Sequence, residues 1–360
     1  MPKKKRRPTA LGVHIFAGGF TVGVKQAGFR VLGHLEDTEY GVSTARLNWP
    51  RLDVRVGKEN WQAKEFSGKV DFLYSNPPCA IFSAAGISVT RGPDAWREDP
   101  RLSCWHRAFG VFETVRPKVF ALESVCRAYT KGREVVDDFT RRAVELGYSV
   151  QHVLMDAKWT GIPQSRKRFF FVAHRPETRL KLNFDFDRPP TVEEVIGLVK
   201  DPGHVVSHDT GANFAQWIEH TLPGKSLRES FNRLVKDKTV VNGRVKGRPG
   251  FMYYRLPRDG QMGPLTGDVF AHPTKNRFIG VEEMKVLCGY PETFQLDGNP
   301  RGHASLLARA VLPPVARWLG KRVRLSLVQP MNRSHESVKM TDLRKPDGLY
   351  KDITAEYEEV

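Results

Sequence analysis

The sequence predicts an α/β protein in which a doubly wound sheet is joined to a smaller domain that is poor in helix. Apolar strands alternate with helical segments from residue 11 to about residue 175, and this alternation is typical of a doubly wound sheet. A stretch rich in proline, glycine and basic residues follows, to about residue 265, and helical patterns then return. A chain of 360 residues with 40% hydrophobic content is long enough for about two domains.

The first elements have the order strand, glycine turn, helix, strand and acid. Glu36 comes eighteen residues after Gly18, a spacing that suits a nucleoside site in which a carboxylate accepts hydrogen bonds from ribose hydroxyls. A turn with only two glycines is, taken alone, more often structural. The expected elements are a strand over Leu11 to Phe16, a turn at Ala17-Gly18-Gly19, a helix over Thr21 to Ala27 ended by Gly28, and a strand over Phe29 to Leu35.

A cysteine follows the next predicted strand on a rigid loop. Val70 to Tyr74 form an apolar strand, and Ser75-Asn76-Pro77-Pro78-Cys79 come directly after it. Consecutive prolines hold φ at about −65° and cannot continue a strand, so the chain turns there. Ligands of open α/β sheets bind at this edge. Cys79 is therefore either a nucleophile or an ordinary buried thiol, and this segment alone leaves both open.

Two further polar groups are predicted at strand ends. Glu123 follows the strand Val119 to Leu122, and a segment ending in Arg166-Lys167-Arg168 precedes the strand Phe169 to Val172. A thiolate, a carboxylic acid and paired arginines suit attack on an electron-poor heterocycle, because the acid bonds a ring nitrogen and an arginine stabilises the developing oxyanion. Individually, these residues could equally be a surface acid and solvated arginines. Between them we expect a helix whose apolar face is Val136, Phe139, Ala143 and Leu146, ended by Gly147, and a strand over Tyr148 to Met155.

The domain boundaries follow from changes in composition. We expect a basic arm over residues 1–10, a large domain made of residues 11–175 and 272–325, a small domain over residues 176–271, and an extended polar tail over residues 326–360. Asn242-Gly243 within Val240 to Lys246 predicts a hairpin in the small domain. The expected later helices are Val281 to Leu287 and a segment near Val311 to Leu319.

The charge balance predicts a polyanionic partner. The chain has 57 Lys and Arg against 40 Asp and Glu, a net charge of +17, which favours nucleic acid or an acidic membrane surface. No apolar run is long enough for a spanning helix, and no secretory signal is recognisable. The four cysteines lack zinc-like spacing, so we expect reduced intracellular thiols and no metal. Lys3 to Arg7 are a nuclear import signal, a phosphate-binding arm or simply a solvated tail.

Together these segments resemble the DNA (cytosine-5) methyltransferases over most of residues 11 to 320. The order and suitable spacing of the matching motifs make chance agreement improbable, although any one of them is weak evidence. The matching segments are Phe16-Ala17-Gly18-Gly19-Phe20, Asn76-Pro77-Pro78-Cys79, Glu123 with Ser124-Val125, Gln164-x-Arg166-x-Arg168, Arg277-Phe278-Ile279-x-x-x-Glu283, and Val311-Leu312-Pro313-Pro314-Val315.

The resemblance implies a Rossmann-like fold that uses S-adenosylmethionine and acts on double-stranded DNA. A target cytosine would be flipped out of the duplex, attacked at C6 by Cys79 and methylated at C5, with Glu123 at N3 and Arg168 at O2. The implied catalytic residues are Cys79, Glu123, Arg166 and Arg168. The implied cofactor residues are Phe16, Gly18, Gly19, Glu36, Asp53, Asn76, Pro78, Arg309 and Val311. The expected DNA-binding residues are Ser83, Gln164, Arg244, Lys246 and Arg248.

The resemblance also sets the expected assembly and location. We expect a monomer without a membrane anchor or metal, in the cytoplasm of a prokaryote or of a phage-infected host, or in the nucleus if the source is eukaryotic. A tRNA cytosine-5 methyltransferase and a catalytically inactive DNA-binding relative are the alternatives.

Three residues or loops depart from the family pattern. The glycine loop is about two residues shorter than usual, and Ser124 stands where the family usually has Asn. Arg309 also replaces an Asn beside the cofactor, with His303 as a second candidate for that position in another register. An arginine facing the sulfonium end would favour a carboxylated cofactor analogue and a 5-carboxymethyl product. The alternative is a neutral substitution that turns toward solvent or DNA phosphate.

Overall fold

The computed structural model describes residues 6–83, 92, 94–184, 188–205, 215–230, 253–265, 270–328, 337–345 and 348–358. Within them a nine-stranded mixed sheet has the strand order β11-β10-β6-β7-β5-β4-β1-β2-β3. The strands are β1 Thr9–Val13, β2 Arg30–Glu36, β3 Asp53–Val56, β4 Phe72–Ser75, β5 Val119–Val125, β6 Ser149–Asp156, β7 Lys167–His174, β10 Val338–Leu343 and β11 Leu349–Asp352.

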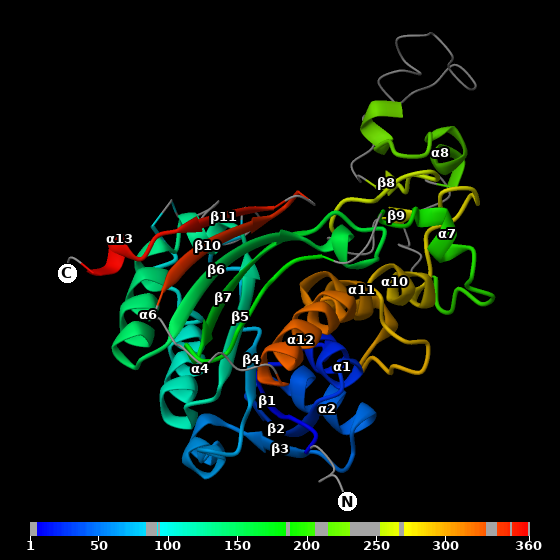
Figure 1. The fold of residues 1–360 in the computed structure, drawn as a ribbon. Helices are drawn as coiled ribbons and strands as arrows, with labels where there is room; N and C mark the ends of the chain where they lie inside the picture. Colours follow the sequence, from blue (N-terminus) through cyan, green and yellow to red (C-terminus); the bar gives the residue numbers. More distant parts are fainter. Residues whose placement is uncertain are drawn as a thin grey trace, which may run out of the picture.

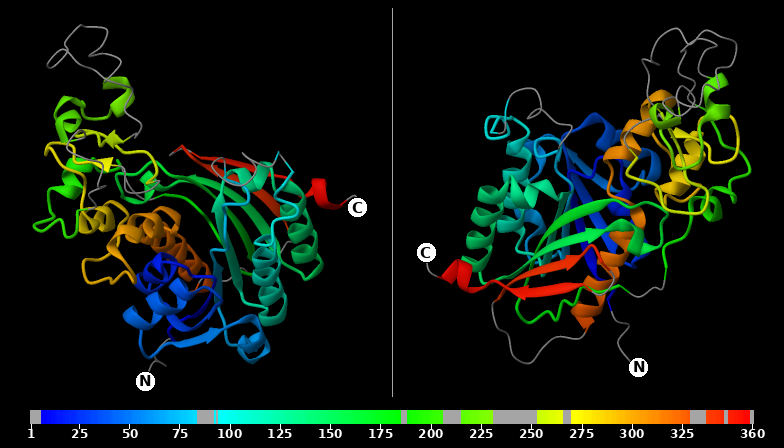
Figure 2. Two further views of the ribbon diagram at one scale, coloured as in Figure 1. Left: turned by 180° about the vertical axis from the view of Figure 1, so that it is seen from behind. Right: turned by 90° about the horizontal axis from the view of Figure 1, so that it is seen from above.

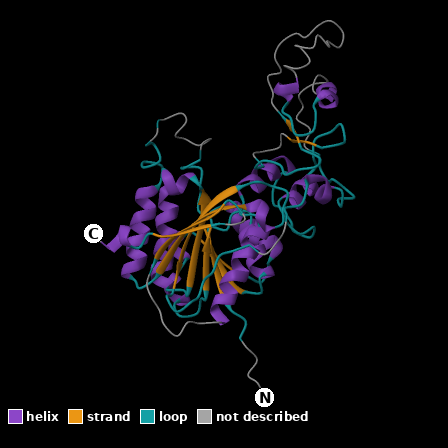
Figure 3. Ribbon diagram, turned by 45° about the horizontal axis from the view of Figure 1, so that its top comes forward, coloured by secondary structure: helices purple, strands orange, loops and turns teal. Residues whose placement is uncertain are grey.

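Helices cover both faces of this sheet, as Figures 1 and 3 show. Side chains that alternate along each strand contribute to two apolar clusters: Val119 and Ala121 of β5 pack on one face, and Phe120 and Leu122 on the other. The predicted doubly wound α/β fold is therefore confirmed. The helices are α1 Gly19–Gln26, α2 Glu39–Asn48, α4 Leu102–Val115, α5 Arg127–Thr130, α6 Arg133–Glu145, α10 Val281–Leu287, α11 Pro300–Arg309 and α12 Pro313–Val328.

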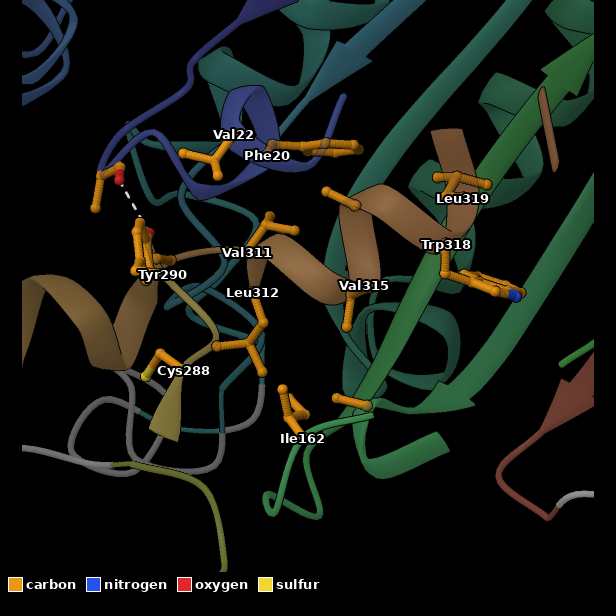
Figure 4. Packing of buried hydrophobic residues seen from close by; sticks show 14 of the residues in the cluster. Phe20, Val22, Ile162, Cys288, Tyr290, Val311, Leu312, Val315, Trp318 and Leu319 are labelled. Atoms are coloured by element: carbon orange, nitrogen blue, oxygen red, sulfur yellow. Dashed lines mark hydrogen bonds between the residues drawn. The ribbon is translucent and has the colours of Figure 1, made fainter. Parts of the chain in front are cut away.

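Helices α1 and α12 pack side by side and run in the same direction (Figure 4). Glycines allow the close approach: a Cβ at Gly19 would lie 2.0 Å from the Val311 carbonyl oxygen, and one at Gly23 would lie 2.3 Å from that of Pro313. Further along the pair, a Cβ at Gly320 would lie 2.8 Å from that of Ala27. The two helices therefore begin together at the glycine turn and continue together toward the opposite edge of the sheet.

The smaller domain lies beyond one end of the sheet in Figures 1 and 2, and its described part contains little regular structure. Its elements are α7 Val192–Ile196, α8 Ala215–His220, β8 Tyr254–Arg255 and β9 Phe270–Ala271. A separate small cluster includes Ile218, Leu227, Tyr253 and Phe278. The predicted hairpin over residues 240–246 lies outside the described residues, and the exact domain boundaries remain a prediction.

The predicted polar tail over residues 326–360 is wrong for its described part. Helix α12 runs to Val328, and β10 then joins the central sheet parallel to β6, with Val338 and Leu343 buried. The alternation of apolar and polar residues over Val338-Lys339-Met340-Thr341 was the missed signal, because β6 offers an edge that such a strand can cover. The short helix α13 Ala355–Glu358 follows, and the Tyr357 hydroxyl donates a hydrogen bond to Asp137 over 2.8 Å.

No helix in the described ranges combines the length and the apolar character that a membrane span requires.

Candidate active site

The strand order reverses between β1 and β4, and the carboxyl ends of these two strands define the candidate site. Strands β2 and β3 continue from β1 in one direction, whereas β5 continues from β4 in the other. The glycine turn follows β1, and the Cys79 loop follows β4. Both segments therefore lie at a topological switch point, where open α/β sheets bind their ligands.

The Cys79 loop is anchored at both ends. The Asn76 N–H donates to the Val13 carbonyl over 3.3 Å, and the indole N–H of Trp105 in α4 donates to the Pro78 carbonyl over 3.1 Å. The Phe82 N–H donates to the Cys79 carbonyl over 3.1 Å, which closes a tight turn after the cysteine. These contacts and the two prolines hold Cys79 in place while leaving it partly exposed.

Glu123 is buried in β5 and is held by two donors. The Asn76 carboxamide donates to Oε2 over 2.8 Å, and Arg168 Nε lies 2.9 Å from Oε1. Strand β5 extends to Val125, beyond its predicted end at Leu122, because β7 pairs with it as far as Val125 and Arg168. The structure thus places Glu123, Arg168 and the first residue of the Cys79 loop in direct contact.

The surroundings raise the pKa of both proton-exchanging groups. Burial raises the pKa of Glu123, and nearby Arg168 and Arg166 oppose that shift. Burial, and then the charge of Glu123, raise the pKa of the Cys79 thiol, again opposed by the two arginines. Glu123 therefore keeps its proton to a higher pH than an exposed glutamate, and Cys79 loses its proton less readily than a free cysteine.

Arg166 is almost completely buried, and it binds the main chain just after the end of α11. One terminal nitrogen donates to the Ala310 carbonyl over 2.9 Å, and the other has no hydrogen-bond partner among the described residues. Burial and the nearby Arg168 lower the pKa of Arg166 to about 10. An unpaired, buried guanidinium nitrogen close to Cys79 and Glu123 suits an oxygen of a bound substrate.

The glycine turn is strained and tightly packed. His14 and Phe16 have left-handed φ angles of 51° and 49°, and Gly18 has a φ of 70°. The Tyr290 hydroxyl donates to the Ala17 carbonyl over 2.9 Å (Figure 4). Helix α1 begins at Gly19, immediately after the turn, so the shorter loop is accommodated without an intervening segment.

Glu36 connects the glycine turn to α2. Its Oε2 accepts from the Phe16 N–H over 3.1 Å, and its Oε1 accepts from the N–H groups of Asp37 and Thr38. A hollow of about 690 Å³ lies beside this edge. Its lining includes Asp37, Thr38, Val42, Val56 and Asp297.

Asp53 was assigned to the cofactor, and the structure contradicts this prediction. Asp53 pairs with Gly33 in the parallel β2–β3 ladder. Glu36 pairs with Val56, three residues further along both strands. Asp53 therefore starts β3 at the amino edge of the sheet, where it binds Arg55 over 3.0 Å. Spacing along the sequence identified a suitable acidic residue. Only the register of β3 against β2 shows that Asp53 lies at the amino edge of the sheet and not at the carboxyl edge.

Gln164 was expected to contact DNA, and this prediction is also wrong. Its side chain is fully buried, with Nε2 3.5 Å from the Leu287 carbonyl and Oε1 3.4 Å from the Leu265 N–H. It joins the loop before β7 to Leu265, near the end of the smaller domain, and to the last residue of α10. Ser83 is half-buried and remains a prediction, whereas Arg244, Lys246 and Arg248 lie outside the described residues.

The positions that depart from the family pattern are also placed. Ser124 is fully buried, and its hydroxyl has no hydrogen-bond partner among the described residues. The Arg309 guanidinium carbon lies 5.0 Å from the Phe16 ring centroid. His303 lies six residues before Arg309 in α11. Burial lowers the pKa of His303, and Asp297 lies nearby. Arg309, rather than His303, is therefore the residue that contacts the glycine turn.

Sequence reasoning missed a polar network that joins α4 to the residue that follows Glu36 at the end of β2. His14 Nδ1 lies 3.1 Å from Asp37 Oδ1, and Arg107 donates to Asp37 Oδ2 over 2.6 Å and to the Cys104 sulfur over 3.0 Å. Asp37 directly follows Glu36, which was the available signal, but α4 itself was not predicted. His14, Asp37 and Cys104 are close enough to share a metal ion, yet Arg107 already supplies a cation there.

Replacing Arg107 by methionine is expected to raise the KM for the cofactor about three- to tenfold, with kcat changed less than twofold. The Arg107–Asp37 pair is about one quarter exposed, so its contribution is modest, but it fixes the residue next to Glu36. Steady-state kinetics at saturating DNA measures this split, with Thr114→Ala, an exposed position on the same helix away from Arg107, as control. A fall in kcat without a change in KM would contradict this role.

The comparisons with known proteins agree on one family. A model of the C-5 cytosine-specific DNA methylases matches residues 14–324. A type II methyltransferase of Haemophilus parahaemolyticus, M1.HphI, is 28% identical over 330 residues, which are 85% of this chain and 84% of that protein. M.MthTI of Methanothermobacter thermautotrophicus is 25% identical over 88% of this chain and 97% of its own length.

Solved structures show the same fold. A protein described as a DNA modification methyltransferase encoded within an E. coli prophage superposes with a TM-score of 0.63 at 18% identity, covering 89% of this chain and 99% of that one. A mutant of Spodoptera frugiperda DNMT2 gives a TM-score of 0.58 at 14% identity, covering 88% and 99%.

Proposed function

The chain belongs to the C-5 cytosine-specific DNA methylases, and we propose that Cys79, Glu123, Arg166 and Arg168 perform the family's reaction on a cytosine of double-stranded DNA. This family transfers a methyl group from S-adenosylmethionine to C5 of cytosine. The contact of Glu123 with both Asn76 and Arg168 is the observation that best supports the proposal, because it joins the acid to the Cys79 loop. Those are the groups that attack on the ring requires.

The residues at the carboxyl edge fit the cofactor. Phe16 offers an aromatic surface, Glu36 a carboxylate that can accept from hydroxyl groups, and the adjacent hollow holds further carboxylates on Asp37 and Asp297. Bound S-adenosylmethionine supplies the electrophilic methyl group. The chain's own part is to hold the nucleoside at Glu36 and to keep the glycine turn, through Tyr290, in a fixed position.

The chemistry on the base follows from the positions of the side chains. C5 of cytosine is a weak nucleophile inside a stacked duplex, so the base must first leave the stack, at a cost of a few kcal/mol. The Cys79 thiolate then bonds to C6, Glu123 donates its proton toward N3, and Arg168 with Arg166 stabilises charge on O2. C5 becomes enamine-like and accepts the methyl group. Removal of the C5 proton and expulsion of Cys79 restore the aromatic ring.

A duplex that contains 5-fluorocytosine tests this proposal. Fluorine at C5 cannot leave as a cation, so elimination stops and the bond between Cys79 and C6 persists. We expect a denaturation-resistant protein–DNA adduct that depends on S-adenosylmethionine and that peptide mass spectrometry maps to Cys79. An adduct only with tRNA would favour the RNA alternative, and no adduct with either nucleic acid would favour an inactive relative.

We propose in addition that the protein acts as a monomer in the cytoplasm of a prokaryotic cell. The bacterial and archaeal sources of the similar methyltransferases support this location over a nuclear one.

Arg309 makes a carboxylated cofactor a second candidate. Its guanidinium lies against Phe16, and its hydrogen bonds go only to Ser305 of its own helix, over 3.1 and 3.2 Å, within the described part of the chain. No acid neutralises it among the described residues, so it can form a bidentate pair with a carboxylate on the transferred group. The product would then be 5-carboxymethylcytosine.

Arg309→Asn is therefore expected to lower the rate with the carboxylated analogue at least about tenfold relative to S-adenosylmethionine. Nucleoside mass spectrometry after reaction with each cofactor measures this ratio, and Arg309→Lys, which keeps the charge but not the fork, is the matched control. If wild type uses only S-adenosylmethionine and Arg309→Asn leaves that preference unchanged, Arg309 does not select the cofactor.

A further inference from the structure

Six exposed cations lie at the end of α1 and along the neighbouring helix α12, toward the amino edge of the sheet. We call this group the basic end patch; it consists of Arg7, Lys25, Arg30, Arg317, Lys321 and Arg324. Arg7 donates to the Gly28 carbonyl over 2.8 Å and Arg324 to the Ala27 carbonyl over 3.1 Å, so both side chains lie at the end of α1. The α12 members recur at intervals of four and three residues, which places them in one stripe on its exposed face.

The patch is not neutralised by acids. Neither α1 nor α12 contains an aspartate or glutamate, and none of the six cations forms an ion pair within the described ranges. The neighbouring Asp71 is already shared by Arg6 at 3.3 Å and Lys118 at 2.9 Å. Burial, and then repulsion from Arg7, lower the pKa of Lys25, which agrees with an excess of positive charge.

Helix dipoles account for only part of this charge. The carboxyl end of α1 presents about half a negative charge, whereas that of α12 lies at Val328, beyond the last cation of the patch. The helix ends therefore balance roughly one of the six cations at most. The remainder is the signature of a surface that meets a polyanion.

Apart from Arg317, which lies beside Gly23 in the first half of α12, the patch lies toward the amino edge of the sheet, opposite the active site. Arg30 begins β2, whereas Glu36 ends it, and the Cys79 loop also lies at the carboxyl edge. Figure 1 shows the N-terminus and the smaller domain at opposite ends of the sheet. Strands of five to seven residues separate the two edges by roughly 15 to 25 Å. A straight duplex in the active site would not reach the patch.

We propose that the basic end patch binds the phosphate backbone of a DNA segment other than the one that holds the target cytosine. Exposed Arg and Lys without acidic partners bind phosphates independently of sequence. Lys3, Lys4 and Lys5 precede Arg6 and Arg7 in the sequence. A second contact on the same long DNA makes rebinding at the active site effectively intramolecular and raises the apparent affinity. The proposal rests on DNA being the substrate.

Matched charge-reversal variants test the proposal. The patch variant is Arg30→Glu/Arg317→Glu/Lys321→Glu, which avoids the two arginines that bind main-chain carbonyls. The control is Lys181→Glu/Lys339→Glu/Lys345→Glu, which changes the net charge equally at exposed positions elsewhere. Each protein is measured on a duplex of about 14 base pairs with one target site and on one of about 60 base pairs that carries the same site.

We expect the patch variant to bind the long duplex about tenfold more weakly. The slope of log affinity against log salt should fall by about two to three, since each lost phosphate contact removes roughly 0.9. Its affinity for the short duplex and its kcat there should stay within about twofold of wild type, as should every value of the control variant. Equal losses on both duplexes, or equal losses in both variants, would overturn the proposal.

Two further measurements distinguish the proposed DNA contact from a folding defect and from a membrane partner. Thermal unfolding, with the milder Arg30→Gln/Arg317→Gln/Lys321→Gln variant as a second probe, identifies a folding defect. If the patch governs binding to vesicles of anionic phospholipid but not to long DNA, the partner is a membrane surface and the proposal fails. Absence of methylation on the short duplex in wild type would instead count against the proposed function.

Discussion

Cys79→Ser is expected to reduce methylation on the order of 10⁴-fold or more, with DNA affinity within about threefold of wild type. A serine hydroxyl ionises far less readily than a thiol, and no base among the described site residues is placed to activate it, since Glu123 must itself be protonated. The loop geometry should survive the exchange, because Trp105 and Val13 anchor the main chain and not the sulfur. Single-turnover methylation and equilibrium binding to the same duplex measure the two effects.

The other three cysteines provide controls of graded stringency. Cys126 shares part of the electrostatic surroundings of Cys79, since Arg168 and Glu123 both influence its pKa. Cys126→Ala should nevertheless keep more than about a third of the wild-type rate, and so should Cys104→Ala. Cys288 is fully buried beside Gln164, so its replacement tests stability rather than chemistry. A turnover of Cys79→Ser within tenfold of wild type would reject Cys79 as the nucleophile.

The motifs that sequence analysis recognised are those whose function depends on local chain geometry. A double proline, a glycine turn and an acid at a strand end each act within a few residues, so their spacing along the chain already describes the site. The structure accordingly brings Cys79, Glu123 and Arg168 together, and it places Gly19 against Val311. The fold class followed from the same local alternation of strands and helices.

The predictions that failed depended on contacts between distant segments. Asp53 lies at the opposite end of β3 from the one it was meant to occupy, and only the pairing of β2 with β3 reveals this. Gln164 resembles a surface amide in sequence, yet Leu265 and Leu287, more than a hundred residues later, bury it. The strand Val338–Leu343 was hidden by its polar composition, and only its pairing with β6 on one side and with β11 on the other shows that it belongs to the sheet.

Helix α4 illustrates the same limit for the site itself. The sequence of Leu102–Val115 contains no motif that indicates a role in the site. In the structure, Trp105 donates a hydrogen bond to the Cys79 loop, and Arg107 donates one to Asp37. One helix therefore contacts both the Cys79 loop and the residue that follows Glu36. Such a connection is visible only once β1, β2 and β4 have been placed side by side.

Glu123→Gln is expected to reduce methylation about 10²- to 10⁴-fold near neutral pH, the usual range for the loss of a positioned acid. Glutamine has nearly the same shape but a single oxygen, so it keeps an acceptor for either Arg168 or Asn76 and turns its NH2 group toward the other donor. The fold should be retained. What is lost is the proton delivered toward N3 of the base. Asn76→Ala, which removes one donor but leaves the acid, should cost less than Glu123→Gln, and the reverse order would contradict the assigned roles.

The dependence of the methylation rate on pH tests the same role of Glu123, because the direction of each change can be predicted. The productive wild-type form has Glu123 protonated and Cys79 ionised. Below the pKa of Glu123, the rate rises with pH because thiolate forms on Cys79. Between the pKa of Glu123 and that of Cys79, the loss of the Glu123 proton cancels that gain. Above the pKa of Cys79, the rate falls. Because burial raises the pKa of Glu123, the level region begins at a higher pH than an exposed glutamate would give.

Glu123→Gln has no proton to lose, so its rate should continue to rise by about tenfold per pH unit through the range where wild type is level. That rise should end at a lower pH than the alkaline limb of wild type, because the negative charge of Glu123, which helps to raise the pKa of Cys79, is gone. Single-turnover rates for both proteins from about pH 6 to pH 9.5 measure the two limbs. Parallel profiles would mean that Glu123 does not exchange a proton in the reaction and acts only by holding the Cys79 loop through Asn76.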